Sequence, residues 1–272
     1  GLYRWLYHSG GETLMALDTD FHSHVSRSSA REMALAAQAR GLRVLGLSEH
    51  IFQMSEARLT LSHLPQEGPL LSKPAYIEAV QTSAWDLQVD VRLGLEVDFI
   101  PEKNEIIQAY LRGHPWDFLI GSVHEVDGIQ FESNKNWQRQ EGEALWLRYF
   151  ALLREAVSSG YFSLVSHPVR MRKQNPYLPP NFDEQLEVLA AEASRCDVAL
   201  EINGYDIETY PSLVRRLAQA CMQQHTPVSV GSDAHIPRQV AQAHAQTEAL
   251  LRQAGIDKVR IWKQRVAEEY RV

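Results

Sequence analysis

The sequence predicts an α/β fold in which parallel strands close into a barrel. Short runs of leucine and β-branched residues alternate with longer segments of helical period, a pattern typical of parallel strands joined by helices. Nearly every apolar run ends in a polar residue, and in such barrels the functional side chains gather at the carboxyl ends of the strands. Seven strand–helix units favour closure. The alternative is an open doubly wound sheet, which would collect ligands from only two or three strands.

The expected strands are short, and the expected helices lie between them. The strands cover residues 17–21, 44–47, 91–97, 118–120, 164–165, 198–202 and 228–230. The helices cover residues 30–40, 74–87, 101–111, 141–159, 183–195, 211–224 and 237–254, and four of them are opened by a proline suited to a first helical turn. Two irregular stretches, 53–73 and 126–139, follow strand tips; each either covers the site or is an ordinary surface loop.

Length and composition favour one domain. With 272 residues and 44% hydrophobic content, a single domain over residues 15–272 has enough apolar sequence for a full core. Residues 1–14 lack a clear period and are interpreted as an extension, disordered or not native, with Met15 as an alternative start. The oligomeric state is left open.

Charge and cysteine content limit the partners. A net charge of −7 without a Lys/Arg cluster argues against a nucleic-acid partner. No stretch is long and apolar enough to span a bilayer, and the N-terminus does not resemble a signal peptide, so no membrane partner is expected. Cys196 and Cys221 lack metal-ligand spacing and are interpreted as reduced thiols, which fits a cytoplasmic protein.

The histidines are unevenly distributed. Six of the eleven follow apolar runs directly: His22, His24, His50, His124, His167 and His235. Because His22 and His24 are two residues apart, they share one face of an extended strand. Two neutral imidazoles held this close form half of a transition-metal site, although an isolated pair is more often a surface or core feature. The joint placement of all six favours a metal site.

Two acids complete the candidate site. Glu96 and Asp233 lie within or at the end of strands, where an unpaired charge is costly and a cation is the natural partner. An ion pair between Glu96 and Arg92 is the alternative, but their spacing disfavours it. Glu49 is expected to orient His50. Glu201 and Asn203 are interpreted as residues that support the ligands, and the role of Asp98 is left open.

Together these residues resemble the polymerase and histidinol phosphatase (PHP) phosphoesterases, and within them the histidinol-phosphatase branch. The segments that carry the resemblance occur in family order over residues 20 to 238, nearly the whole chain. They are Asp20-x-His22-x-His24, Ser48-Glu49-His50, Gly94-Leu95-Glu96-Val97-Asp98, Gly121-Ser122-Val123-His124, His167-Pro168, Glu201-Ile202-Asn203 and Gly231-Ser232-Asp233-Ala234-His235. The family fold is a distorted TIM-like (β/α)7 barrel, which agrees with the strand count.

The resemblance implies two or three divalent ions, with Zn, Mn or Fe suited to the mixed donors. His22, His24, Glu96 and Asp233 would hold the first ion, and Glu96 would bridge to a second ion at His124 and His167. His50 and His235 would hold the third. A further histidine is usual in the family shortly after the His-x-His pair, but Ala30 stands there. Alanine cannot ligate, so we expect the third ion to be weakly bound or lost.

The predicted reaction is hydrolysis of a small phosphate ester. Two cations that share a carboxylate can share a water and present hydroxide to phosphorus. The resemblance implies L-histidinol phosphate as substrate, in histidine biosynthesis. Because the protein is acidic overall, the phosphate needs local cations, for which Arg27 and Arg170 are the first candidates and Arg172 and Lys173 weaker ones.

The remaining roles and functions stay open. His235 or a water is expected to protonate the leaving group, and the candidates for contact with the organic part are Phe52, Trp137 and Tyr205. One alternative function is a family phosphatase with another small phosphoester. A second is an amidohydrolase, although no lysine suited to bridge metals, such as Lys73, Lys103 or Lys135, follows an apolar run. The third is a non-catalytic metal-binding module, which ligand loss at residue 30 would favour.

Overall fold

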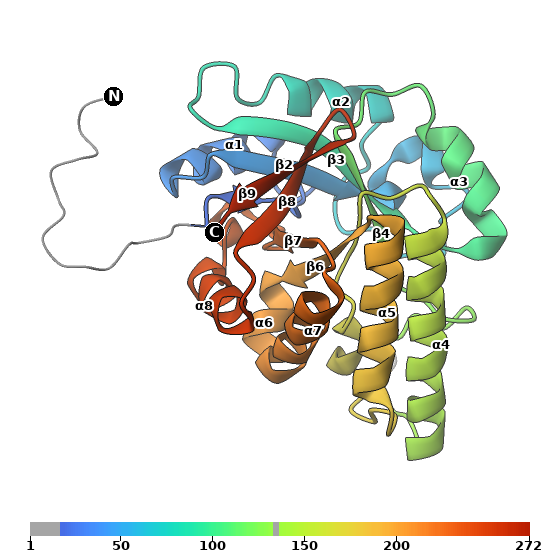
Figure 1. Ribbon diagram of the computed structural model, residues 1–272. Coiled ribbons are helices and arrows are strands. Elements are labelled where there is room, and N and C mark those ends of the chain that lie inside the picture. Colours follow the sequence, from blue (N-terminus) through green and yellow to red (C-terminus); the bar gives the residue numbers. More distant parts are fainter. Residues whose placement is uncertain (1–16, 133–135) are drawn as a thin grey trace, which may run out of the picture.

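Seven parallel strands form the centre of the protein in the computed structural model, which describes residues 17–132 and 136–272. The strands follow one another around the sheet in the order of the chain, from β1 to β7 (Figure 1). They are β1 (Thr19–Asp20), β2 (Val44–His50), β3 (Asp90–Asp98), β4 (Phe118–Ser122), β5 (Leu164–Val165), β6 (Ala199–Asn203) and β7 (Val228–Gly231). The extension expected over residues 1–14 lies outside the described residues.

Backbone hydrogen bonds between the first and last strands close the sheet into a barrel. The Phe21 N–H donates to the Val230 carbonyl at 3.0 Å, and the His24 N–H donates to the Ala234 carbonyl at 2.8 Å. A sheet whose edges pair in this way has no reversal of strand order and none of the crevice of a doubly wound fold. The predicted seven-stranded barrel is therefore confirmed, and the open sheet is excluded.

Eight helices in the described part of the chain connect the strands and cover the outside of the barrel (Figure 1). They are α1 (Ala30–Ala39), α2 (Lys73–Gln81), α3 (Asn104–Leu111), α4 (Arg139–Ser158), α5 (Phe182–Cys196), α6 (Gly204–Thr209), α7 (Pro211–Gln224) and α8 (His244–Ala254). Capping residues explain where several of these helices begin and end. Ser29 caps α1 by accepting the Glu32 N–H at 3.1 Å, and Gly41, with φ of 73°, follows the last turn.

Three predicted helices differ in extent, and one helix was not predicted. Helix α3 begins at Asn104 rather than at residue 101, because residues Pro101–Lys103 form a separate 3-10 turn. Helix α2 ends at Gln81 because the hydroxyls of Thr82 and Ser83 donate back to main-chain carbonyls. Helix α8 begins at His244 rather than at residue 237, because the N–H of Ala241 turns away to donate to the buried Asp20 carboxylate at 3.0 Å. Helix α6 forms directly after β6, where the Asn203 side chain caps it.

A C-terminal hairpin, also not predicted, covers the barrel at the N-terminal ends of the strands. It consists of β8 (Lys258–Lys263) and β9 (Val266–Arg271), which cross this end in Figure 1. The Trp262 ring stacks on Phe118 at 6.4 Å between centroids and meets the edge of Phe21 at 5.8 Å. Gly46 makes room for these rings, since a Cβ there would lie 2.7 Å from Phe118 Cζ. This end is therefore apolar and filled.

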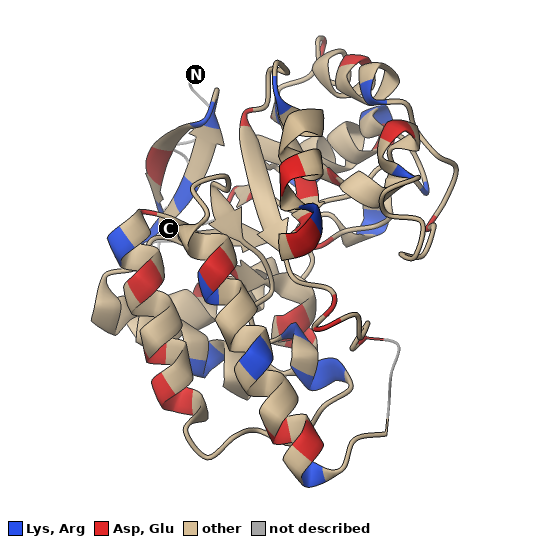
Figure 2. Ribbon diagram, turned by 90° about the vertical axis from the view of Figure 1, so that its right-hand side faces the viewer, with Lys and Arg blue, Asp and Glu red and all other residues tan. Residues whose placement is uncertain are grey.

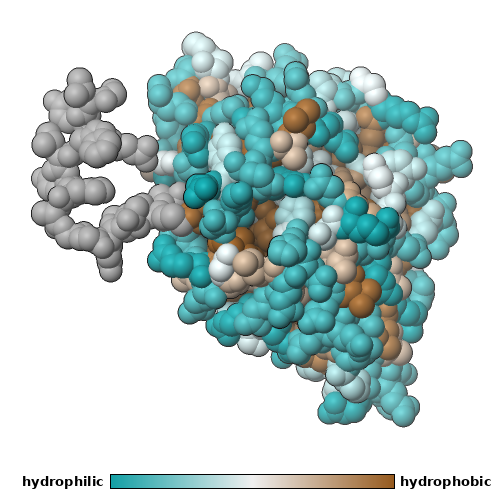
Figure 3. All heavy atoms as spheres, viewed as in Figure 1, coloured by the Kyte–Doolittle hydropathy of each residue, from teal (hydrophilic) through white to brown (hydrophobic). Residues whose placement is uncertain are grey.

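The outer surface is polar and of mixed charge. Acidic and basic residues are interspersed along the helices in Figure 2, and the face shown in Figure 3 is mostly hydrophilic with small separate hydrophobic groups. Among the described residues, no helix has both the length and the hydrophobicity needed to cross a membrane.

We expect Trp262→Ala to destabilise the protein by about 3–5 kcal/mol, because it empties the apolar end of the barrel. Trp85→Ala is the matched control: Trp85 is 84% exposed and Trp262 only 3%. The control should change the free energy of unfolding by less than about 0.5 kcal/mol. Urea denaturation with a constant m-value measures both, and equal effects would show that the hairpin does not contribute to the core.

Candidate metal centre

Histidine and acidic side chains from the strands meet at the carboxyl-terminal end of the barrel. All eight residues predicted as metal ligands lie there: His22, His24, His50, Glu96, His124, His167, Asp233 and His235. Parallel strands end on the same rim, and the register pairs His50 directly with Glu96. The barrel thus brings together residues more than 200 positions apart in the chain.

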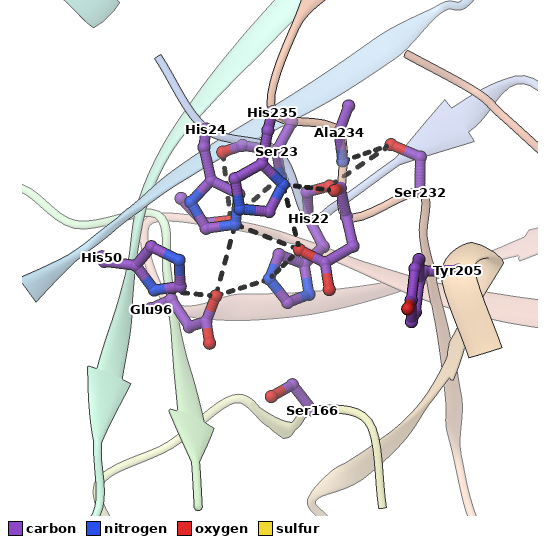
Figure 4. Close-up of polar contacts among 12 residues, drawn as sticks. His22, Ser23, His24, His50, Glu96, Ser166, Tyr205, Ser232, Ala234 and His235 are labelled. Atoms are coloured by element: carbon purple, nitrogen blue, oxygen red, sulfur yellow. Dashed lines mark hydrogen bonds and ion pairs between the residues drawn. The ribbon is translucent and has the colours of Figure 1, made fainter. Parts of the chain in front are cut away.

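Glu96 lies at the centre of this group and is fully buried. Its Oε1 lies 2.6 Å from His22 Nε2 and 3.4 Å from His24 Nε2 (Figure 4). Its Oε2 lies 3.0 Å from His124 Nε2 and 3.5 Å from His167 Nε2. Oε1 also lies 3.4 Å from His50 Nδ1. The two carboxylate oxygens therefore face different sets of imidazoles, which is the arrangement needed to bridge two cations.

Asp233 completes the first of these donor groups. Its Oδ1 lies 3.2 Å from His24 Nε2 and 3.4 Å from His22 Nε2, and these donors lie within 4.8 Å of one another and of Glu96. The backbone at Asp233 is in the left-handed region, with φ of 60°, and its N–H donates to the His22 carbonyl at 2.8 Å. A strained backbone held in this way is typical of a functional position.

Several buried polar atoms around Glu96 have no hydrogen-bond partner among the described residues. They are Glu96 Oε2, His50 Nδ1, His167 Nδ1, Asp98 Oδ1 and Glu67 Oε2. Buried polar atoms are nearly always paired, because an unpaired one loses its hydration without compensation. Clustered donors of this kind fit divalent cations.

The Nδ1 atoms of His22 and His124 are anchored, which directs the Nε2 atoms of these two rings into the site. His22 Nδ1 lies 2.5 Å from Glu201 Oε2, and His124 Nδ1 lies 2.8 Å from Asp98 Oδ2. Contacts of this type fix the orientation of a metal-binding histidine. Glu201 and Asp98 therefore support ligands, which resolves the ambiguity that the sequence left for both.

Glu49 supports a different histidine from the one expected. Its Oε2 lies 3.3 Å from His24 Nδ1, whereas it reaches His50 only through the backbone N–H, at 2.9 Å. The expectation that Glu49 orients the His50 ring is therefore wrong. The reason is that Glu49 points to the opposite face of β2 from His50 and so reaches the loop after β1.

The charges around the centre favour bound positive charge. Burial acts to raise the pKa of Glu96, but the imidazoles of His50 and His22 outweigh it and hold that pKa well below its usual value. Burial acts to lower the pKa of His24, but Asp233 and Glu49 raise it to about 10. The carboxylates thus hold protons on the imidazoles, and a divalent cation would take the place of those protons.

A cavity of about 410 Å³ opens above the donors. Glu96 and His167 contribute to its floor, and its walls include Arg27, Lys173 and Tyr205. This volume suits a small-molecule ligand, and the two cationic side chains suit an anionic one.

Arg170 lines the cavity but is less free than predicted. Its Nε donates to Asp206 Oδ1 at 2.6 Å, and its Nη2 donates to Asp233 Oδ2 at 2.8 Å. Only Nη1 is left toward the cavity, 3.5 Å from Glu132 Oε1. The bidentate phosphate contact expected from the sequence is therefore not available from this rotamer, because two carboxylates already hold the guanidinium.

Acidic residues at the site that were not predicted include Glu67, besides the Asp206 and Glu132 that contact Arg170. Glu67, in the irregular stretch after β2, places Oε2 3.2 Å from His50 Nε2 and 3.4 Å from His235 Nε2. The expectation of a weak third ion rests on the lack of a donor at Ala30, and Glu67 places a carboxylate oxygen beside the other two predicted donors of that ion. No strand, period or motif marks Glu67 in the sequence; its position after a strand tip was the only indication.

Two of the three aromatic residues predicted to contact the organic part of the substrate lie at the site. Phe52 stacks on His50 with 4.3 Å between ring centroids, and Tyr205 lines the cavity, whereas Trp137 packs against the hydrophobic core instead. Lys73 Nζ and Lys103 Nζ donate to main-chain carbonyls away from the cavity, so neither bridges metals as an amidohydrolase lysine would. Lys135 lies outside the described residues.

Comparison with known proteins agrees with this site. Residues 18–204 match the model of the PHP domain. The chain belongs to the PHP domain family. The histidinol-phosphatase of Lactococcus lactis subsp. lactis and the probable histidinol-phosphatase of Deinococcus radiodurans are relatives of this PHP protein, at 25% identity over 264 residues and 29% over 255 residues. These matches cover 89% and 87% of this chain, and 93% of each relative.

A solved structure confirms the fold. The crystal structure of histidinol phosphate phosphatase from Lactococcus lactis, complexed with zinc, L-histidinol and phosphate, matches this PHP protein with a TM-score of 0.73. The match covers 93% of this chain and 98% of the other at 22% identity. The predicted PHP-type barrel is therefore the fold of this chain.

We expect the affinity for divalent metal to rise with pH up to about pH 10, because the pKa of His24 is raised to about 10 and each proton on an imidazole competes with the metal. The dissociation constant should fall about tenfold per pH unit for each proton displaced. Calorimetric titration between about pH 6 and about pH 8, in buffers of different ionisation enthalpy, counts the protons released. Binding that releases no protons would contradict this account of the electrostatics.

Proposed function

We propose that this protein is a metal-dependent phosphomonoesterase that hydrolyses L-histidinol phosphate to L-histidinol and phosphate, a step of histidine biosynthesis. Membership of the PHP family and the two histidinol-phosphatase relatives over most of the chain support this proposal. The single observation that carries it is the Glu96 carboxylate, which turns one oxygen to His22 and His24 and the other to His124 and His167.

The donors suit two ions bridged by Glu96. We assign His22, His24, Glu96 and Asp233 to one ion, and Glu96, His124 and His167 to the other. The mixture of imidazole and carboxylate donors suits Zn, Mn or Fe, and the structural relative is complexed with zinc. When bound, two such ions lower the pKa of a shared water and neutralise charge on phosphoryl oxygens.

The protein's own side chains position the substrate beside the metal-binding residues. Arg27 and Lys173 line the cavity and supply positive charge to a phosphate that the protein as a whole would repel. Arg170 offers Nη1 to the cavity and donates from Nη2 to Asp233 and from Nε to Asp206, so its main role is positioning. His235 donates from Nδ1 to the Asp233 carbonyl at 2.9 Å, which turns Nε2 toward Glu67 at the edge of the cavity and supports a ligand role.

A substrate panel tests the proposal. Metal-loaded protein is assayed against L-histidinol phosphate and a set of sugar and nucleotide phosphates, and we expect kcat/KM for histidinol phosphate to be at least about tenfold above the others. Chelation should abolish the activity, and zinc or manganese should restore it. Glu96→Gln should remove most of the metal and the activity together, because it removes the bridging charge.

Each contrary result has a clear meaning. Good activity on another ester without activity on histidinol phosphate would identify a different phosphatase of the PHP family. Absence of hydrolysis with any divalent metal would favour the non-catalytic binding module.

We expect Arg27→Ala to raise KM for the phosphate ester by about tenfold or more while the metal content stays unchanged, because a charged hydrogen bond to phosphate is lost. Arg31→Ala is the matched control, since Arg31 binds Asp86 on the outer surface with a distance of 3.0 Å between Nη2 and Oδ2. Steady-state kinetics and metal analysis of both variants provide the comparison. An unchanged KM in Arg27→Ala would remove Arg27 from the phosphate site.

A further inference from the structure

Three donors from separate segments converge beside the Glu96 centre. His50 ends β2, His235 follows β7, and Glu67 belongs to the loop between β2 and α2. Glu67 Oε2 lies 3.2 Å from His50 Nε2 and 3.4 Å from His235 Nε2. Donors about 2.0–2.1 Å from a tetrahedral zinc ion are separated from one another by about 3.3–3.4 Å. The two observed distances are close to two edges of such a tetrahedron, and the two histidines also have donor atoms within 4.8 Å of one another and of His24.

The orientation of the His235 ring is fixed by the main chain. Its Nδ1 lies 2.9 Å from the Asp233 carbonyl, which turns Nε2 toward Glu67. Glu67 Oε2 is buried and has no hydrogen-bond partner among the described residues, so it too is directed at this point.

The loop holds Glu67 in this position through its own contacts. The Gln53 side chain, fully buried, accepts the Glu67 N–H at 2.6 Å and donates to the Gly68 carbonyl at 3.2 Å. Gly68 lies directly against the main chain after β1, since a Cβ there would be 2.7 Å from the Ser26 carbonyl oxygen. The carboxylate is thus placed by backbone and amide contacts that do not depend on a cation.

We propose that Glu67 is the third protein ligand of a divalent ion held by His50 and His235, in place of the histidine that the family carries at the position of Ala30. This inference rests on the proposed function, because it adds an ion beside the Glu96-bridged pair. It has a structural consequence. A ligand at residue 30 would come from the start of α1, whereas Glu67 makes the ion link the loop over residues 53–72 to the barrel.

Glu67→Gln tests the ligand role, because it keeps the shape of the side chain and removes its charge. After dialysis against a limiting chelator, we expect this variant to retain one equivalent of metal per chain less than the wild type by elemental analysis. The dissociation constant of the most weakly held ion should rise by at least about tenfold. Glu67→His, which returns an imidazole to the site, should recover part of the binding.

Glu56→Gln is the matched control, since Glu56 lies in the same loop but accepts the Lys73 N–H at 2.9 Å outside the cavity. Its metal content should equal that of the wild type. Hydrogen exchange gives a second readout: metal should slow exchange over residues 53–72 in the wild type and in Glu56→Gln, and much less in Glu67→Gln. This readout is independent of catalytic activity.

The outcomes separate this inference from the proposed function. Unchanged stoichiometry and affinity in Glu67→Gln would overturn the assignment of Glu67 and leave the bridged pair intact. A wild-type protein that binds only two ions, with no effect of metal on loop exchange, would overturn it as well. Loss of all metal from the wild type under mild dialysis would contradict the metal centre of the proposed function itself.

Discussion

Burial of negative charge is the constraint on which this structure depends. Glu96 and Glu201 are almost fully withdrawn from water, and Glu49 and Asp233 lie beside them. A buried carboxylate is tolerated only where positive charge and hydrogen-bond donors surround it. Here the compensation comes from imidazoles, from Arg170 and, as we propose, from divalent ions. The positions of the surrounding side chains follow from this need, because each one either neutralises a carboxylate or holds a residue that does.

The interior of the barrel is apolar at one end and polar at the other, which keeps the buried charges together. At the N-terminal ends of the strands, Trp262 and Phe118 fill the space with apolar rings; at the opposite ends, the side chains are polar. Gly231 shows how close the strands must come at the polar end. A Cβ at this position would clash with the His22 side chain and would lie 2.8 Å from Glu201 Oε2. The apolar end supplies packing energy, and the polar end can then carry charges that contribute little to stability.

Much of the site could be predicted because parallel strands end on one rim. Once His50 or Glu96 is placed at the end of a strand, its approach to the other strand ends follows from topology rather than from detailed packing. The C-terminal hairpin was not predicted, because the role of Trp262 depends on a space that exists only after closure. Helix α8 began later than expected because Asp20, more than 200 residues away, accepts the backbone N–H of Ala241, which precedes the helix. Neither contact leaves a local signal in the sequence.

The sequence by itself determined the seven parallel strands, the family and the set of side chains at the strand ends, because periodicity and spacing are local properties of the chain. Only the tertiary structure decided how these side chains are used: that Glu49 supports His24, that two carboxylates hold Arg170, and that Glu67 faces His50 and His235. The reason is physical. A strand end specifies where a side chain starts, whereas its partner depends on rotamers and loop paths set by packing across the whole barrel.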